Sequence, residues 1–128
     1  MVESHEKGFL GLNDMKCINR YALIVRPKKP FLDWVNFNDP EHPMTLAEIR
    51  EEPNAYLLPE IEDSGEQQNY LEENCGEIFR HELYGCYTDE KLFPKDLSWN
   101  FFVEWFDWEI LSMVIDTLDR PIRKEAVD

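Results

Sequence analysis

Two acidic residues and a histidine recur at a spacing that could bind a cation. Glu73, Glu77 and His81 follow one another at four-residue intervals, so a helix would line them along one stripe. Carboxylate and imidazole groups are ligands of divalent metal ions. One stripe supplies too few ligands, and the Glu-x-x-His spacing of di-iron helices is absent from the sequence. We therefore expect no metal and no cofactor. Glu66, Glu73, Glu77 and His81 are interpreted instead as an exposed face that contacts a partner.

Nucleophilic catalysis would need a cysteine or serine beside a base. Cys75 and Cys86 are 11 residues apart, which places both on one buried helix face, where cysteine mostly acts as a small apolar side chain. His42 stands in a proline-flanked loop without a partner evident in the sequence. No nucleophile elbow, glycine-rich phosphate loop or HExxH motif is found. We predict no catalytic residue. The three cysteines, without a CxxC pair, fit reduced thiols in the cytoplasm.

Two acid–tryptophan pairs are the candidates for a ligand pocket. Asp33 precedes Trp34, and Asp107 precedes Trp108. A desolvated carboxyl group beside a groove could act as a general acid or bind a ligand. These four residues support an alternative function, a small enzyme or ligand-binding protein with carboxylates beside a Trp-lined pocket. The simpler interpretation is acids that face solvent next to core tryptophans.

The negative charge is concentrated in one segment. The chain has a formal charge of −14, and residues 39–90 hold 15 acidic residues but only two basic ones, Arg50 and Arg80. The other 76 residues hold 12 acidic and 11 basic residues. An acidic surface repels phosphate groups and anionic lipids, which excludes nucleic acid and membranes as partners. The sequence thus favours a non-enzymatic protein-interaction or regulatory protein that acts through an acidic surface on a protein with a basic surface.

Strand and helix patterns alternate along the first half of the chain. The apolar run 21–26 predicts a buried strand, and 31–36 predicts a short helix. Thr45 and Glu48 have capping-box spacing, so a helix of about two turns should begin there. A second short strand is predicted over 55–58.

The longest predicted helix runs from about Gly65 to Tyr84, after a second capping-box spacing at Ser64 and Gln67. Its inner face should carry the apolar residues at helical spacing, which are Leu71, Cys75, Ile78 and Phe79. Glu82 falls on the same side. We expect it to reach out to water from a frayed helix end.

The aromatic-rich segment 98–118 changes its period. Leu97, Phe101 and Trp105 recur at helical spacing, whereas the residues from Trp108 onward alternate. Both sides of the alternating part are largely apolar, which predicts a central strand covered on both faces. A single helix of about 20 residues is the alternative.

Together these elements predict an α+β fold. We expect a small three-stranded, mainly antiparallel sheet packed with about four helices, in the order β-α-α-β-α-α-β. Residues 19–119 should form a single domain, between an irregular N-terminal arm (1–18) and a C-terminal tail (120–128). The sequence has no signal-peptide h-region and no bilayer-spanning apolar run, which predicts a cytoplasmic protein of unknown oligomeric state.

Two stretches carry a resemblance to a known family. RYALIVRPKKPFLDWVN (20–36) and FVEWFDWEILSMVID (102–116) resemble the two ends of a family of small, acidic bacterial proteins of uncharacterised function. The resemblance covers about Asn19 to Pro121 and leaves out the first 18 residues. It implies a bacterial, cytoplasmic, single-domain protein. It implies no catalytic residue, cofactor or substrate.

Overall fold

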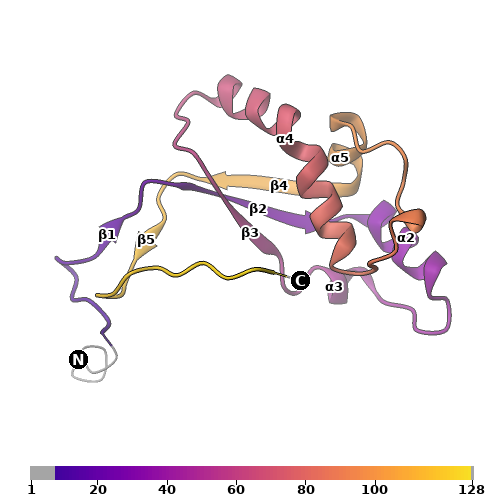
Figure 1. The fold of residues 1–128 in the computed structure, drawn as a ribbon, viewed down its shortest axis with the longest axis horizontal. Coiled ribbons are helices and arrows are strands. Elements are labelled where there is room, and N and C mark those ends of the chain that lie inside the picture. Colours follow the sequence, from indigo (N-terminus) through magenta and orange to yellow (C-terminus); the bar gives the residue numbers. More distant parts are fainter. Residues whose placement is uncertain (1–7, 128) are drawn as a thin grey trace.

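The fold is a small antiparallel sheet with helices packed on one face (Figure 1). The computed structural model describes residues 8–127. In chain order the elements are β1 (Lys16–Cys17), β2 (Tyr21–Pro27), α2 (Lys29–Asn38), α3 (Leu46–Ile49), β3 (Asn54–Leu58), α4 (Ser64–Tyr84), a 3₁₀ turn (Glu90–Leu92), α5 (Trp99–Trp105), β4 (Phe106–Leu111) and β5 (Ile115–Asp116). The predicted α+β class, with four helices and antiparallel sheets, is confirmed. The predicted order is incomplete, because it lacks β1 and β5.

Strand β2 is the centre of the three-stranded sheet, whose order is β3-β2-β4. It pairs antiparallel with both neighbours, so that Leu23 lies between Tyr56 and Ile110. Leu23 and Val25 are fully buried. Its aliphatic and β-branched run suits this position, since a central strand has no edge facing water.

Strand β4 lies at an edge of the sheet, so the prediction of a central strand covered on both faces is wrong. Phe106, Trp108 and Ile110 pack against the core, whereas Asp107, Glu109 and Leu111 are exposed. The prediction assumed that the apolar residues on the second side of the segment, Leu111, Met113 and Ile115, are covered. In the structure these three side chains are exposed. Segment 99–111 is a helix followed by a strand, and the change falls at Phe106, ahead of the predicted start at Trp108.

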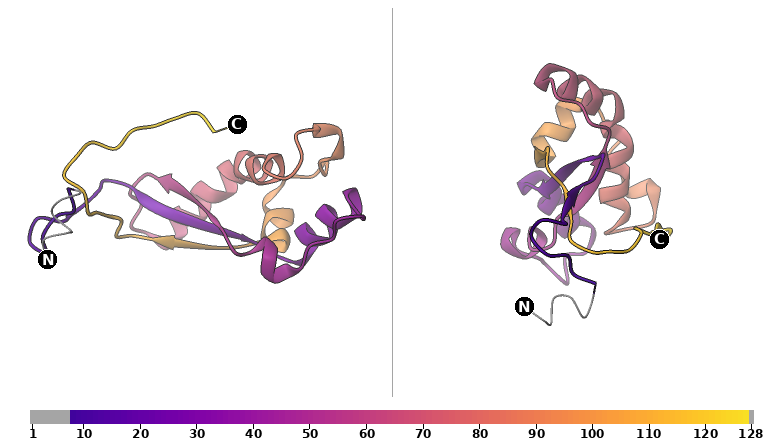
Figure 2. Two further views of the ribbon diagram at one scale, coloured as in Figure 1. Left: turned by 90° about the horizontal axis from the view of Figure 1, so that it is seen from below. Right: turned by 90° about the vertical axis from the view of Figure 1, so that its left-hand side faces the viewer.

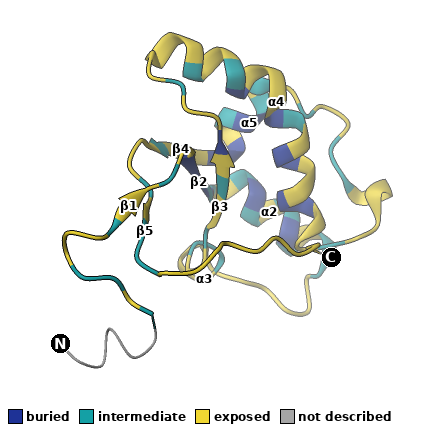
Figure 3. Ribbon diagram, turned by 60° about the vertical axis from the view of Figure 1, so that its left-hand side comes forward, coloured by how far each residue is buried: buried dark blue, intermediate teal, exposed yellow. Residues whose placement is uncertain are grey.

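The core is aromatic and lies between the sheet and α4. Phe79 of α4 is fully buried, and its ring contacts those of Trp105 and Phe106 at centroid distances of 5.4 and 5.1 Å. The four residues predicted for the inner face of α4 are all buried (Figure 3). Trp105 is the one tryptophan that is buried, and the other three are partly buried against the same core.

The helix caps decide where the helices begin. At α3 the predicted capping box is present: Thr45 Oγ1 accepts from the Glu48 amide at 3.2 Å, and Glu48 Oε1 accepts from the Thr45 amide at 2.8 Å. At α4 the predicted Ser64 cap is wrong. Asp63 caps this helix, and its carboxylate accepts from the Glu66 amide at 2.9 Å.

Beyond the three-stranded sheet, the chain continues as a narrow two-stranded ribbon, here called the distal ribbon (residues 8–20 and 112–119). Strand β1 pairs antiparallel with β5, and an isolated bridge joins Phe9 to Leu118. The predicted irregular arm is therefore paired over part of its length, and residues 1–7 of that prediction lie outside the described residues. Residues 120–127 run back toward the body without regular structure (Figure 1).

Candidate functional site

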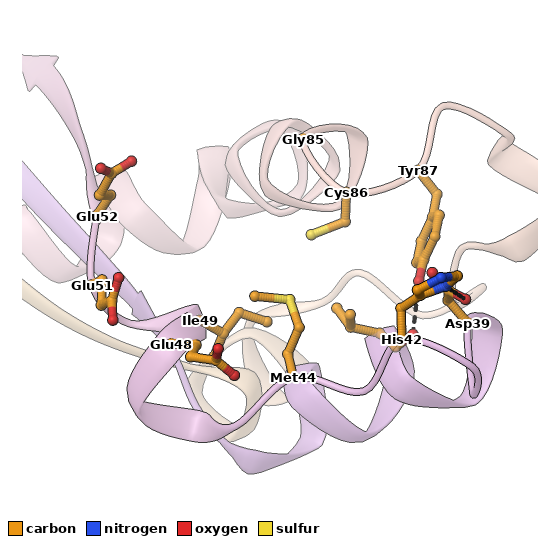
Figure 4. A pocket seen from close by; sticks show the side chains of 11 residues that line it. Asp39, His42, Met44, Glu48, Ile49, Glu51, Glu52, Gly85, Cys86 and Tyr87 are labelled. Atoms are coloured by element: carbon orange, nitrogen blue, oxygen red, sulfur yellow. Dashed lines mark hydrogen bonds and ion pairs between the residues drawn. The ribbon is translucent and has the colours of Figure 1, made fainter.

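An open groove lies between α3 and the C-terminal end of α4 (Figure 4). Its volume is about 550 Å³, within the range of roughly 300–1,000 Å³ that ligand sites occupy. The chain reaches it from three places: the end of α2 and the loop after it, α3 with Glu51 and Glu52 just beyond it, and the turn that ends α4. The lining residues are Val35, Asp39, His42, Met44, Glu48, Ile49, Glu51, Glu52, Gly85, Cys86 and Tyr87.

The floor of the groove is apolar and is fixed by local hydrogen bonds. Val35 is buried beneath it, and the side chains of Met44 and Cys86 extend into it from opposite sides (Figure 4). Asn36 of α2 binds the backbone of Met44 twice, donating to its carbonyl at 3.0 Å and accepting from its amide at 2.8 Å. Tyr87 donates its hydroxyl to the Val35 carbonyl at 2.7 Å, which ties the end of α4 to α2.

Carboxylates line the groove with little cationic compensation. Asp39 pairs with His42 at 3.0 Å. Neither Glu51 nor Glu52 has an ion-pair partner within the described part of the chain. The groove therefore carries a negative potential that a concave wall focuses.

Both arginines of the acidic segment are occupied away from this groove. Arg50 pairs with Asp107 at 3.0 Å and donates to the Pro27 carbonyl at 2.7 Å. Arg80 pairs with Glu90 at 2.6 Å. Neither arginine lines the groove. The groove carboxylates are therefore not neutralised by an arginine of this segment and can interact with a cationic ligand.

Glu82 lies in the interior at the inner end of the groove. A smaller cavity of about 150 Å³ contains Glu82 and shares Ile49, Glu52, Gly85 and Cys86 with the groove. Glu82 is only 8% exposed, so the prediction that it reaches out to water is wrong. Its Oε2 accepts the hydroxyl of Tyr56 and the amide of Asn54 (2.8 Å), and both donors come from β3. A buried carboxylate needs such donors because its loss of hydration is costly.

The buried carboxylate affects the acidity of two neighbours. Burial, together with the Glu82 charge and the hydrogen bond to it, raises the pKa of Tyr56 above its ordinary value. Cys86 lies beyond the end of α4 and is exposed, so the prediction that it shares a buried helix face with Cys75 is wrong. Partial burial of its thiol, and to a lesser extent the Glu82 charge, nevertheless raises the pKa of Cys86 to about 11. The thiol that faces the groove is therefore protonated near neutral pH and is a poor nucleophile.

His81 is exposed, as predicted, but it also joins this cluster. Its Nδ1 lies 2.9 Å from the Tyr56 hydroxyl. Because the single hydroxyl proton of Tyr56 is donated to Glu82, Nδ1 must be the donor to the phenol oxygen. The hydrogen-bond network thus assigns the Nδ1–H form of His81.

The four residues that the sequence proposed for partner binding have different surroundings in the structure. Glu66, Glu73 and Glu77 are exposed on the outer side of α4, and Glu77 lies 3.7 Å from Arg80. His81 is engaged with the sheet as described above. The four residues do not form one free stripe.

The four residues proposed for a Trp-lined pocket are not brought together in the groove. Asp33 pairs with Lys29 at 3.0 Å, and the Trp34 indole donates to the Leu92 carbonyl at 2.8 Å. Asp107 points to the exposed face of β4, whereas Trp108 packs on Trp99 on the other face. None of the four tryptophans lines the groove or the small cavity.

Sequence reasoning missed the groove carboxylates, although two signals were present. Glu48, Glu51 and Glu52 are spaced at i, i+3 and i+4 from a recognisable capping box, which aligns them on one side of the α3 turn. Glu82 stood out as an acid on an apolar helix face.

Comparisons with known proteins give this chain no relative. No protein-family model, curated protein or solved structure matches it. The resemblance of residues 20–36 and 102–116 to a bacterial family therefore stays a prediction. Over residues 8–127, no helix is both long and apolar enough to cross a membrane. The same residues contain no group of three or more His, Cys, Asp or Glu side chains arranged to hold a metal ion.

Removing the Tyr56 hydroxyl should destabilise the protein. Tyr56→Phe takes one donor from the buried Glu82, and we expect the free energy of unfolding to fall by about 1–3 kcal/mol in urea denaturation. Tyr84→Phe is the matched control, because its exposed hydroxyl has no hydrogen-bond partner within residues 8–127. Equal unfolding free energies for the two variants would contradict the role of Tyr56.

The raised pKa of Cys86 should slow its alkylation. At pH 8 we expect iodoacetamide to modify Cys86 roughly 100-fold more slowly in the folded protein than in the urea-unfolded chain, because only the thiolate reacts and the pKa rises from an ordinary 9.0 to about 11. The folded-state rate should increase with pH with a midpoint near pH 11, and Glu82→Gln should raise it at pH 8. Peptide mass spectrometry follows Cys86 separately from Cys17, which is exposed as well. Equal rates in the folded and unfolded states would contradict this assignment.

Proposed function

We propose that this chain is a non-enzymatic protein-interaction protein that binds a basic segment of a partner protein in the groove between α3 and α4. The observation that carries the proposal is a set of groove carboxylates without compensating cations above an apolar floor. A regulatory role fits the same chemistry, since the bound segment would be shielded from other partners.

The groove suits a lysine or arginine side chain. Such side chains combine an aliphatic stem with a charged end and commonly bury the stem against apolar surface. The stem would lie on Met44 and Ile49, and the charged end would meet Glu51 and Glu52. The cavity of about 550 Å³ has room for one or two such side chains.

The outer face of α4 would contribute in a different way. Glu66 and Glu73 are exposed to solvent, where salt screens their charge and ion pairs are weak. We assign to them the steering of a basic partner toward the groove. The same field repels nucleic acid and anionic lipids, which supports a protein as the partner.

A cytoplasmic location is part of the proposal. Cys17, Cys75 and Cys86 are all free thiols, and none forms a disulfide. Free cysteines are typical of proteins that work in a reducing compartment.

Two charge-neutralising triple variants test the groove. We expect Glu48→Gln/Glu51→Gln/Glu52→Gln to weaken binding of a short fluorescent peptide rich in lysine and arginine at least tenfold, or about 1.4 kcal/mol, by fluorescence anisotropy at low salt. Glutamine at position 48 keeps the capping box. The control, Glu66→Gln/Glu73→Gln/Glu77→Gln, removes the same charge from the outer face of α4 and should weaken binding by less. Equal losses in both variants, or no binding by the natural chain, would overturn the proposal.

A second candidate, a small-ligand or catalytic site at Glu82, is favoured by one observation. Glu82 is a buried carboxylate that borders a cavity, and both of its hydrogen bonds fall on Oε2, which leaves Oε1 for a ligand. No tryptophan borders this cavity, so the site differs from the Trp-lined pocket that the sequence suggested.

A titration with methylammonium separates the two functions. Under the interaction proposal, we expect the amide NMR signals of Asn54 and Cys86 to shift weakly, without saturation, and alike in the natural chain and in Glu82→Gln. We expect this because the Glu82 carboxylate already accepts hydrogen bonds from Tyr56 and Asn54. A saturable shift that Glu82→Gln abolishes, in a variant that keeps its fold, would favour the small-ligand function.

A further inference from the structure

Residues 120–127, here called the tail segment, return from the distal ribbon to the C-terminal end of α4. The tail segment leaves the ribbon after Asp119 and runs back toward the helices (Figures 1 and 2). Val127 lines a cavity of about 380 Å³, whose other lining residues are Asn54, His81, Tyr84, Gly85 and Thr88. The tail segment therefore reaches the last turn of α4 and the start of β3.

The cavity that Val127 lines adjoins the groove between α3 and α4. It shares Gly85 with the groove, and it shares Asn54 and Gly85 with the small cavity beside Glu82. That small cavity in turn shares four residues with the groove. Lys124 precedes Val127 by three residues, which separates their Cα atoms by at most about 11 Å even in an extended backbone. The basic part of the tail segment is thus held close to the rim of the groove.

The tail segment carries a charge opposite to that of the groove. It holds three basic residues, Arg120, Arg123 and Lys124, and one acidic residue, Glu125. Arg123 lies 3.9 Å from Glu125, and both side chains are largely exposed, so this ion pair is weak. Neither Arg120 nor Lys124 has an ion-pair partner within residues 8–127. These cations are therefore available to the groove carboxylates.

The tail segment is held loosely. Among the described residues, the last backbone-to-backbone hydrogen bond before it joins the Asp119 amide to the Gly8 carbonyl at 2.9 Å, and the tail segment itself forms none. All eight of its residues are exposed, and Val127 is 76% exposed even beside the cavity. Segments with few buried contacts and no backbone hydrogen bonds open at little cost in free energy. The tail segment can therefore move from the cavity into the adjoining groove.

We propose that the tail segment is an intramolecular competitor for the groove, so that the chain restrains its own binding of a basic partner. This inference rests on the function proposed above and adds its regulation. Arg123 and Lys124 pair with the groove carboxylates in place of the partner. A tethered segment meets its site at an effective concentration in the millimolar range, so even weak pairing keeps the groove partly occupied.

The competition sets a threshold for partners. A groove that the tail segment occupies for about two thirds of the time binds a partner about threefold more weakly. A partner segment with more basic residues displaces the tail segment, whereas a weakly basic one does not. The tail segment thus raises the selectivity of the groove for strongly basic segments.

Peptide affinity tests the competition. By fluorescence anisotropy at low salt, we expect Arg123→Gln/Lys124→Gln to bind the peptide rich in lysine and arginine about threefold more tightly than the natural chain does. Lys16→Gln/Arg20→Gln is the matched control, because it removes the same charge from exposed residues of the distal ribbon, which extends away from the helices. The control should keep nearly the natural affinity. A gain in the tail variant no larger than that in the control would overturn the proposal.

Backbone amide NMR tests the contact without any peptide. In the free protein, Arg123→Gln/Lys124→Gln should shift the signals of residues 48–52 and 85–87, and the ribbon control should leave them in place. Unchanged groove signals in the tail variant would overturn the competition even where the peptide binds. Shifted groove signals together with no peptide binding by either the natural chain or the tail variant would instead overturn the proposed function, and the competition with it.

Discussion

The burial of the Glu82 carboxylate determines how α4 lies against the sheet. A carboxylate withdrawn from water needs hydrogen-bond donors at short range, and Tyr56 and Asn54 on β3 supply them. These bonds fix the position of the last turns of α4 along β3, while Phe79 packs the same helix against the aromatic core. The turn that follows then carries Cys86 to the wall of the groove. Loss of the donors would disturb the helix position and the groove together.

The division of charge along the chain gives the molecule two different surfaces. The groove and α4 gather the acidic residues, with their arginines paired elsewhere, and are suited to a basic protein segment. The distal ribbon and the outer sheet face, opposite the helices, are far less charged, since residues 8–27 and 106–119 hold five acidic and three basic residues.

The sequence predicted those features that depend on local patterns. The buried run of β2, the capping box at Thr45 and the inner face of α4 follow from propensity, capping chemistry and periodicity. The groove depends on how α3 lies beside the end of α4, which no local pattern encodes. Glu82 was recognised as a conflict, but its donors lie 26 and 28 residues away in the chain. Strand β4 was taken for a central strand because composition does not distinguish an apolar side chain in a core from one on an open surface.

The most direct measurement of the central claim is a map of where a basic segment binds. Backbone amide NMR signals of the isotope-labelled protein would be followed while an unlabelled peptide rich in lysine and arginine is added. The account predicts that the largest shifts fall on residues 48–52 and 85–87, on the two sides of the groove, and that they diminish as salt is added. Largest shifts over residues 66–77 on the outer face of α4, or no shifts at low salt, would contradict it.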